Sequence, residues 1–182
     1  MVKSGALGSD NNYTYTNDIE SRLEIVLSES HVRKEQNEYG AYAPAVSAAL
    51  ESIGKALVDG GLERELTELM KLRASQINGC AYCIQYHLNI LRKLGVPAEK
   101  LDLLVVWPEV DIYTEREQAA LGWTELVNDI AHGPISDEAY EMIHEEFSEK
   151  EVYLLTAAII EINGYNRFGA VYRASPPIPK HR

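Results

Sequence analysis

The sequence predicts an all-α fold. Apolar residues recur at the three- and four-residue spacing of amphipathic helices along most of the chain, and no segment alternates convincingly as a half-buried strand does. A serine or threonine followed three residues later by a glutamate predicts a capped helix start at three places: Ser21 with Glu24, Thr114 with Glu117, and Ser148 with Glu151. The first of these begins a short amphipathic run that carries Leu23, Val26 and Leu27.

Two further helices are predicted before the cysteine pair. Pro44 suits the first turn of an alanine-rich helix that runs to about Val58, where Asp59-Gly60-Gly61 stops it. The next helix begins at about Leu62 and ends at Asn78-Gly79, because a glycine accommodates positive φ. Its apolar residues recur at helical spacing: Leu62, Leu66, Leu69, Met70 and Ile77.

A new helix is predicted to begin at about Cys80 and to end at Gly95-Val96-Pro97. Its apolar face consists of Ile84, Leu88, Leu91 and Leu94. Residues 102 to 113, around Trp107-Pro108, are predicted to form a loop or a short turn.

The last part of the chain is predicted to contain three helices. The first lasts from Thr114 to about Ala131 and is broken by Gly133-Pro134. A short helix follows over residues 137 to 147, and an apolar helix then begins at Ser148.

The composition indicates one soluble helical domain, which we place at residues 19–175 with its core motif at 62–95. Residues 1–18 are expected to be a disordered or vector-derived leader, and residues 176–182 an extended, loose tail. A net charge of −11 argues against a nucleic-acid partner, since phosphate requires a basic surface. The apolar runs are too short to span a membrane and no signal peptide is evident, so we expect a cytoplasmic protein.

The chain also contains a faint internal echo, since QINGCAYC (76–83) and EINGYNRF (161–168) align under a shift of 85 residues. The shift places four aromatic residues opposite the chemically reactive residues of the first copy: Tyr153, Tyr165, Phe168 and Tyr172. A duplicated helix–break–helix unit and a chance match both explain the echo. We expect these aromatic residues in the core or at a subunit interface.

The stretch NGCAYCIQYH holds the only two cysteines of the chain, Cys80 and Cys83, with His87 four residues after the second. If a helix begins here, its unsatisfied amides and the positive end of its dipole favour a thiolate. His87 then lies on the same helical face as Cys83 and can take its proton, directly or through one water. A thiolate attacks peroxides, disulfides and electrophiles, so the pattern indicates redox or nucleophilic chemistry.

The pair fits a two-step redox cycle, in which an attacking thiolate becomes a sulfenic acid and a second cysteine condenses with it to a disulfide. Cys83, beside His87, is the expected attacker. Cys80, nearer the helix end and expected to be more exposed, is the expected resolving cysteine and the point of attack for an outside reductant. Glu68, on the preceding helix, is placed to orient His87, although spacing alone does not single it out from neighbouring acids.

Other interpretations stay open at this point. The cysteines can be small core residues, or they can sense oxidants in a non-enzymatic assembly module. A zinc site has the right ligand types in Cys80, Cys83, His87 and Glu68, although three ligands on so short a stretch of helix make a closed tetrahedron awkward. A thioredoxin-type fold lacks its βαβ pattern here, and c-type haem attachment requires a histidine where Ile84 stands.

The stretch ELMKLRASQINGCAYCIQYHLNILRKLG contains a glutamate, eleven intervening residues and then C-x-x-C-x-x-x-H, which fall on Glu68, Cys80, Cys83 and His87. It resembles the core of the AhpD-like alkylhydroperoxidases, within the carboxymuconolactone decarboxylase superfamily. The segments YTEREQAALGWTELV and IIEINGYNRFGAVYR are similar to the same branch. The resemblance therefore covers roughly residues 42 to 173.

This resemblance implies an all-helical protein that assembles into trimers or hexamers and uses no metal or organic cofactor. It implies a peroxidase cycle with Cys83 peroxidatic, Cys80 resolving, and His87 and Glu68 as a proton relay. The substrate would be a hydroperoxide. The reductant would be a protein or small-molecule dithiol, which bears a lipoyl group in the best-known members.

The sequence also departs from the family in one place. Tyr82 stands between the cysteines where some of the peroxidases carry a histidine, which weakens the expected relay. Asn166-Arg167 is similar to the closing motif of the branch, with no role that the sequence assigns. Decarboxylases of the superfamily lack the cysteine pair, so lactone decarboxylation fits poorly.

Overall fold

The computed structural model describes residue 38 and residues 40–180. All regular structure within these residues is helical, as the periodicity predicts. The expected leader, the capping box at Ser21 with its amphipathic run, and the last two residues of the tail lie outside the described residues.

The first two described helices follow their predicted boundaries closely. Helix α3 (Pro44–Gly60) has its proline in the first turn and ends at Gly61, whose φ of 92° is left-handed. Helix α4 (Arg64–Ile77) begins slightly after the predicted Leu62 and stops where Gly79 takes a φ of 66°. The glycines therefore end these helices for the reason that the sequence indicates, which is access to positive φ.

Helix α5 (Ala81–Leu94) begins directly after Cys80 and ends at Gly95. The following segment is more helical than predicted, because α6 (Ala98–Asp102) and the 3₁₀ helix η1 (Leu104–Glu109) occupy much of the expected loop. Both elements are too short for a helical period to be visible in the sequence.

The third part of the domain contains α7 (Glu115–Asn128), α8 (Asp137–Ile143) and α9 (Glu149–Tyr172). Both predicted capping boxes are present at the starts of α7 and α9. Helices α7 and α8 each end before their predicted last residues, Ala131 and residue 147.

Of the two explanations for the echo, the structure favours the chance match over a duplicated helix–break–helix unit, because α9 continues through Asn163 and Gly164 without a break. Gly164 does not end a helix; it lets α9 approach α3. A Cβ atom there would lie 3.2 Å from Cδ2 of Leu50. Of the aromatic group, Tyr153 is 77% exposed in this chain and so lies outside the core, and its place at a subunit interface stays a prediction.

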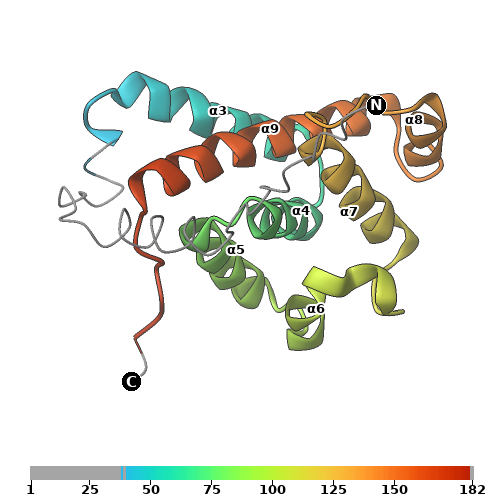
Figure 1. Ribbon diagram of the computed structural model, residues 1–182, viewed down its shortest axis with the longest axis horizontal. Helices are drawn as coiled ribbons and strands as arrows, with labels where there is room; N and C mark the ends of the chain where they lie inside the picture. Colours follow the sequence, from blue (N-terminus) through green and yellow to red (C-terminus); the bar gives the residue numbers. More distant parts are fainter. Residues whose placement is uncertain (1–37, 39, 181–182) are drawn as a thin grey trace, which may run out of the picture. The chain divides into compact units, whose positions relative to one another are not determined.

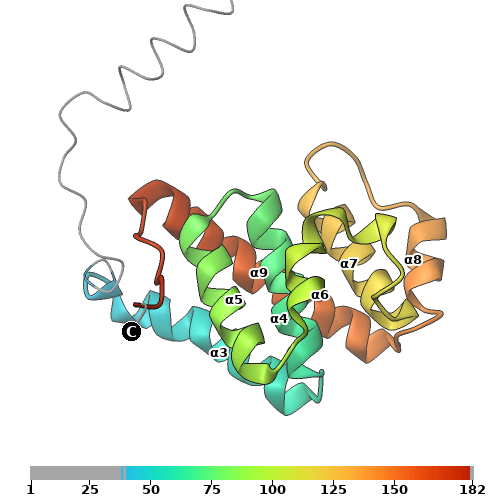
Figure 2. The ribbon, with the colours of Figure 1, turned by 90° about the horizontal axis from the view of Figure 1, so that it is seen from below.

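Helix α4 is the centre of the packing, since it contacts α5, α7 and α9, while α3 lies along α9 (Figures 1 and 2). One core cluster joins α4 to α7, α8 and α9, and includes Leu66, Met70, Trp123, Ile143, Leu155 and Ile159. A second joins α4 to α5, α6, η1 and α7, and includes Leu69, Leu72, Leu91, Leu104 and Leu121. Each fully buried side chain of this kind contributes roughly 1.5–3 kcal/mol.

The described part of the tail is extended, as predicted, but it is held to the domain. The side-chain amide of Asn89 on α5 donates a 2.8 Å hydrogen bond to the carbonyl oxygen of Pro177. No helix within residues 40–180 combines the length and apolar character that crossing a bilayer requires.

Candidate functional site

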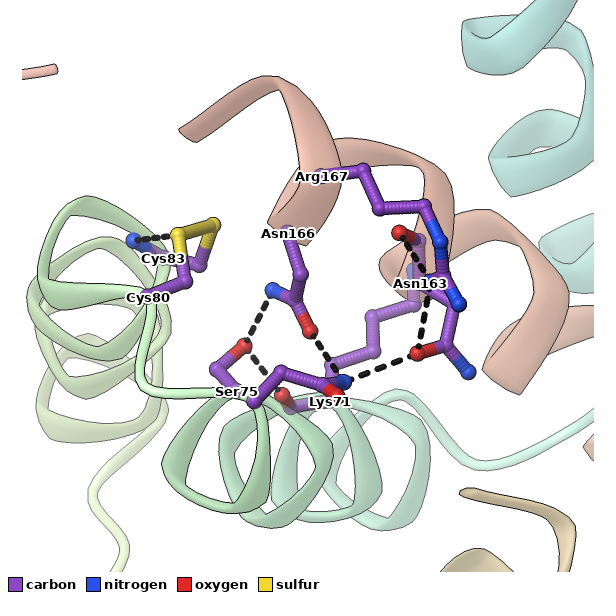
Figure 3. The surroundings of a disulfide bond; sticks show 8 residues. Lys71, Ser75, Cys80, Cys83, Asn163, Asn166 and Arg167 are labelled. Carbon is purple, nitrogen blue, oxygen red and sulfur yellow. Dashed lines mark hydrogen bonds between the residues drawn. A yellow bond between two sulfur atoms is a disulfide. The ribbon is translucent and has the colours of Figure 1, made fainter. Parts of the chain in front are cut away.

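The two cysteines lie at the start of α5 and are joined by a disulfide (Figure 3). Cys80 is the residue that caps the helix, and its Sγ accepts a 3.3 Å hydrogen bond from the backbone N–H of Cys83. Their Cα atoms are 5.3 Å apart, within the range that disulfides bridge. The local sequence therefore places two thiols at the positive end of a helix dipole, as predicted.

The expected exposure of Cys80 is wrong. Cys80 is 2% exposed and Cys83 3%, so Cys80 is no more accessible than its partner. The reason is α9, which the local sequence pattern does not reveal. Both sulfurs pack beneath it with Ile162, and a Cβ atom added to Gly169 would overlap the Sγ of Cys80.

A network of hydrogen bonds joins the break between α4 and α5 to helix α9. The backbone N–H of Cys80 donates to the carbonyl oxygen of Ser75 at 3.1 Å, and the Ser75 hydroxyl accepts a 3.0 Å hydrogen bond from the Asn166 amide. The Oδ1 of Asn166 in turn accepts from the side-chain amide of Asn78 at 3.0 Å (Figure 3). Asn166, which the sequence left without a role, therefore ties the loop before Cys80 to α9.

Glu68 and His87 meet as predicted, one from α4 and the other from α5. The Nδ1 of His87 lies 2.6 Å from Oε2 of Glu68, and both side chains are buried. A charge-assisted bond of this length orients the imidazole and favours a proton on Nδ1. Nε2 is then the ring nitrogen that can exchange a proton with another group.

A pocket of about 700 Å³ brings three of the four predicted site residues together, since Cys83, His87 and Glu68 all line it. Cys80 is not among the lining residues. The walls are largely apolar and aromatic, and include Leu57, Ile90, Ile162, Tyr82, Tyr86 and Tyr165. Small-molecule sites have this character, with a few polar groups in a mainly apolar lining.

The pocket contains a second pair of charged side chains, which the sequence did not indicate. The Nζ of Lys71 on α4 lies 2.7 Å from Oε2 of Glu161 on α9, and their side chains are 11% and 8% exposed. The contact is not aligned as a hydrogen bond, so the attraction is chiefly ionic. A Cβ atom at Gly54 would come against Oε1 of Glu161, so this glycine makes room for the carboxylate.

Two tyrosines in the pocket remain protonated well beyond neutral pH. Burial, and next the charge of Glu68, raise the pKa of Tyr86. Burial, and next the charge of Glu161, raise the pKa of Tyr165. Tyr86 also stacks on Tyr82 with ring centroids 6.1 Å apart, and meets the ring of His87 edge-on at 5.3 Å. These rings form an aromatic wall beside the histidine.

Comparisons with known proteins identify relatives of this chain. The model of the carboxymuconolactone decarboxylase family matches residues 44–126, which contain Glu68, both cysteines and His87. The uncharacterized protein YdfG of Bacillus subtilis is 33% identical over 129 residues, which are 71% of this chain and 88% of that one. The crystal structure of a protein of unknown function from Agrobacterium tumefaciens, a candidate antioxidant-defence protein AhpD, is 36% identical. It superposes with a TM-score of 0.75 over 80% of this chain and all of that one.

The protein belongs to the carboxymuconolactone decarboxylase family, in its AhpD-like branch. The debrominase Bmp8 shares the same fold, with 22% identity and a TM-score of 0.66 over 75% of this chain and 73% of that one. The family match ends within α7, so Glu161, Asn166 and Gly169 on α9 lie beyond it. The signal for them is three-dimensional: Glu161 contacts Lys71, Asn166 contacts Ser75, and Gly169 lies against Cys80.

The zinc interpretation finds no geometric support in this AhpD-like site. Among the residues that the structure describes, no three histidine, cysteine or acidic side chains converge as a metal ion needs. The thiols bond to each other, and the Nδ1 of His87 is held by Glu68.

Proposed function

We propose that the protein is a dithiol peroxidase that reduces hydroperoxides through a cycle of thiolate, sulfenic acid and disulfide. The observation that carries the proposal is the pocket itself, which is lined both by Cys83 and by a histidine that a buried glutamate orients. The disulfide partner of Cys83 is the cysteine that such a cycle needs for its second step.

In the first half-reaction, the Cys83 thiolate attacks the terminal oxygen of the hydroperoxide and the O–O bond breaks. The sulfur is oxidised to a sulfenic acid, and the leaving alkoxide takes a proton from His87 to become an alcohol. Cys80 then attacks the sulfenic sulfur, so that the disulfide forms and water leaves. Glu68 stabilises the protonated imidazole between these steps.

A dithiol closes the cycle by taking the disulfide back to two thiols and becoming a disulfide itself. The reductant that we propose is a small-molecule dithiol or a protein-borne one, such as a lipoyl group. The debrominase Bmp8, which shares this fold, has also been solved in complex with 2,3,4-tribromopyrrole, so this compound is a second substrate to assay beside the hydroperoxide.

Steady-state consumption of an organic hydroperoxide with a dithiol reductant tests the proposal. We expect turnover by the native protein, none by Cys83→Ser, and sulfenic-acid labelling by a dione probe in Cys80→Ser. If the protein is oxidised only once and no dithiol recycles it, the interpretation as an enzyme is wrong and a redox sensor is supported. Turnover that survives Cys83→Ser would remove Cys83 from the attacking role.

We also propose that the protein is a homo-oligomer, a trimer or a hexamer. Its mass in solution, measured by sedimentation or light scattering, tests this independently of activity. A monomer at assay concentrations would contradict the proposed assembly.

A further inference from the structure

The two sulfurs of the disulfide have different surroundings. Cys83 lines the pocket, whereas Cys80 is absent from the lining and is 2% exposed. Helix α9 covers Cys80 so closely that any side chain at Gly169 would overlap its Sγ. A molecule in the pocket therefore meets the sulfur of Cys83 and not that of Cys80.

Three contacts hold Cys80 in this covered position. Its backbone N–H is bonded to Ser75, and the Asn166 amide bonds the Ser75 hydroxyl from α9. The apolar side chain of Ile162, also on α9, packs against both cysteines. Exposing Cys80 would require the C-terminal part of α9, which carries Gly169, to move away from the start of α5.

We infer that the dithiol reductant attacks the Sγ of Cys83, through the pocket that the peroxide uses, and that Cys80 is the leaving thiolate. This inference rests on the proposed function and specifies its reductive half. It reverses the expectation from the sequence, in which the reductant meets the pair at Cys80.

The step balances as an ordinary thiol–disulfide exchange. A reductant thiolate bonds to the Sγ of Cys83, the Cys80–Cys83 bond breaks, and its electron pair stays on Cys80. The second thiol of the reductant then attacks the mixed disulfide, releases Cys83 as a thiolate and leaves an oxidised, cyclic disulfide. The two protons of the dithiol end on Cys80 and on Cys83 or His87.

The leaving group is placed to accept that charge. The Sγ of Cys80 already accepts the N–H of Cys83 at the first turn of α5, where free amides and the helix dipole stabilise an anion. A thiol that is a stabler anion leaves faster in exchange. Accessibility and leaving-group chemistry therefore favour the same direction of attack.

The charges of the pocket narrow the class of reductant. Three carboxylate side chains line it, those of Glu51, Glu68 and Glu161. Two cationic side chains, those of Arg64 and Lys71, also line it. The whole chain carries a net charge of −11. Like charges disfavour association, so we expect slim neutral dithiols to reduce the disulfide faster than anionic thiols such as glutathione.

The test begins from the full-length oxidised protein and needs no peroxide. Mercaptoethanol, a neutral monothiol, is added, the mixture is quenched in acid, the free thiol is capped with N-ethylmaleimide, and fragmentation mass spectrometry locates each adduct. We expect mercaptoethanol on Cys83 and maleimide on Cys80. Mercaptoethanol mainly on Cys80 at the earliest times would overturn the inference.

Matched variants control for migration of the adduct between the two sulfurs. Cys80→Ser carrying mercaptoethanol on Cys83 is compared with Cys83→Ser carrying it on Cys80. We expect dithiothreitol to release the adduct at least about tenfold faster from Cys83, because exchange rates depend on access to the attacked sulfur. Equal rates, or faster release from Cys80, would also overturn the inference.

These results separate the inference from the proposed function. If the reductant attacks Cys83 but the protein does not turn over hydroperoxide, the inference about the attacked sulfur holds and the proposed peroxidase activity is wrong. If the protein turns over hydroperoxide rapidly but the reductant attacks Cys80, the proposed peroxidase activity holds and the inference about the attacked sulfur is wrong.

Discussion

The buried ion pair in the pocket gives the sharpest stability prediction. The Nζ of Lys71 and Oε2 of Glu161 are 2.7 Å apart, and both side chains are about nine-tenths buried. If one charge is removed, water cannot fully solvate the charge that remains. Replacing Lys71 by methionine keeps the length of the side chain and removes the charge. Glu161 is then left as a buried carboxylate beside the apolar pocket wall and Gly54.

The expected cost of Lys71→Met is about 3–5 kcal/mol, the usual penalty for leaving one charge of a buried pair uncompensated. A domain of this kind has roughly 5–15 kcal/mol of stability in total. Each kcal/mol shifts the melting temperature by about 2–4 °C at this chain length, so we expect a fall of roughly 6–20 °C. Urea unfolding of the oxidised protein at fixed concentration measures the free energy directly.

The double variant Lys71→Met with Glu161→Met should recover most of the loss, because a buried pair replaced by apolar residues of similar volume is often neutral. The matched control is Glu63→Gln, which breaks a 3.0 Å contact with Arg116 at a carboxylate that is 55% exposed. We expect that control to cost less than about 1 kcal/mol. A loss of the same small size for Lys71→Met, or no recovery in the double variant, would refute the reasoning.

Three further predictions concern the packing of Gly169 over Cys80, the role of His87 as a base, and the capping box at the start of α9. Gly169→Ala should destabilise the oxidised protein by about 1–3 kcal/mol through overlap with Cys80, measured by urea unfolding. The control Gly122→Ala has only an ordinary 4.0 Å contact and should not destabilise; equal losses would contradict the close packing. His87→Ala should move the alkylation of reduced Cys83 to higher pH, and an unchanged rate profile would remove His87 from the mechanism. Hydrogen bonds from the backbone and the hydroxyl of Ser148 lower the pKa of Glu151 to about 2. Its contribution to stability is therefore complete above the unfolded value, near pH 4.3, and is lost as the pH falls toward 2. Glu151→Gln should be less stable than the native protein at pH 7, with a difference that shrinks in acid; a difference independent of pH would contradict this.

The sequence predicts those parts of the molecule that local interactions determine. The starts of α7 and α9 follow from their capping boxes, and the ends of α3 and α4 follow from Gly61 and Gly79, because caps and positive φ are properties of a few adjacent residues. The Glu68–His87 contact was predicted from motif spacing and a family resemblance. The tripeptide Ile-Asn-Gly ends a helix at Gly79 but not at Gly164, because packing against α3 decides the second position.

The burial of Cys80 could not be predicted in this way, because it depends on a helix that lies far along the chain. Gly169 and Asn166 carry no local signal for the disulfide that they cover and support. The expectation that Cys80 is exposed came from its place at a helix end, which is usually a solvated position. Here tertiary packing overrides that tendency, and with it changes which sulfur a reductant can reach.

The polar face of α4 shows why stability and site geometry depend on the same contacts. Glu68, Lys71 and Ser75 recur at helical spacing on this face and are buried or nearly so. A buried polar group destabilises the fold unless it is paired. Each of the three has a partner on another helix, and the Ser75 hydroxyl also donates to the carbonyl oxygen of Lys71 within α4. The partners are on α5 and α9: His87, Glu161 and Asn166. Each pairing that offsets the desolvation of α4 also fixes part of the site: the imidazole, the charged pair in the pocket, and the start of the disulfide helix. Removing a partner should therefore weaken the fold and misplace the chemistry together, whereas replacing both members of a pair by apolar residues should separate the two effects.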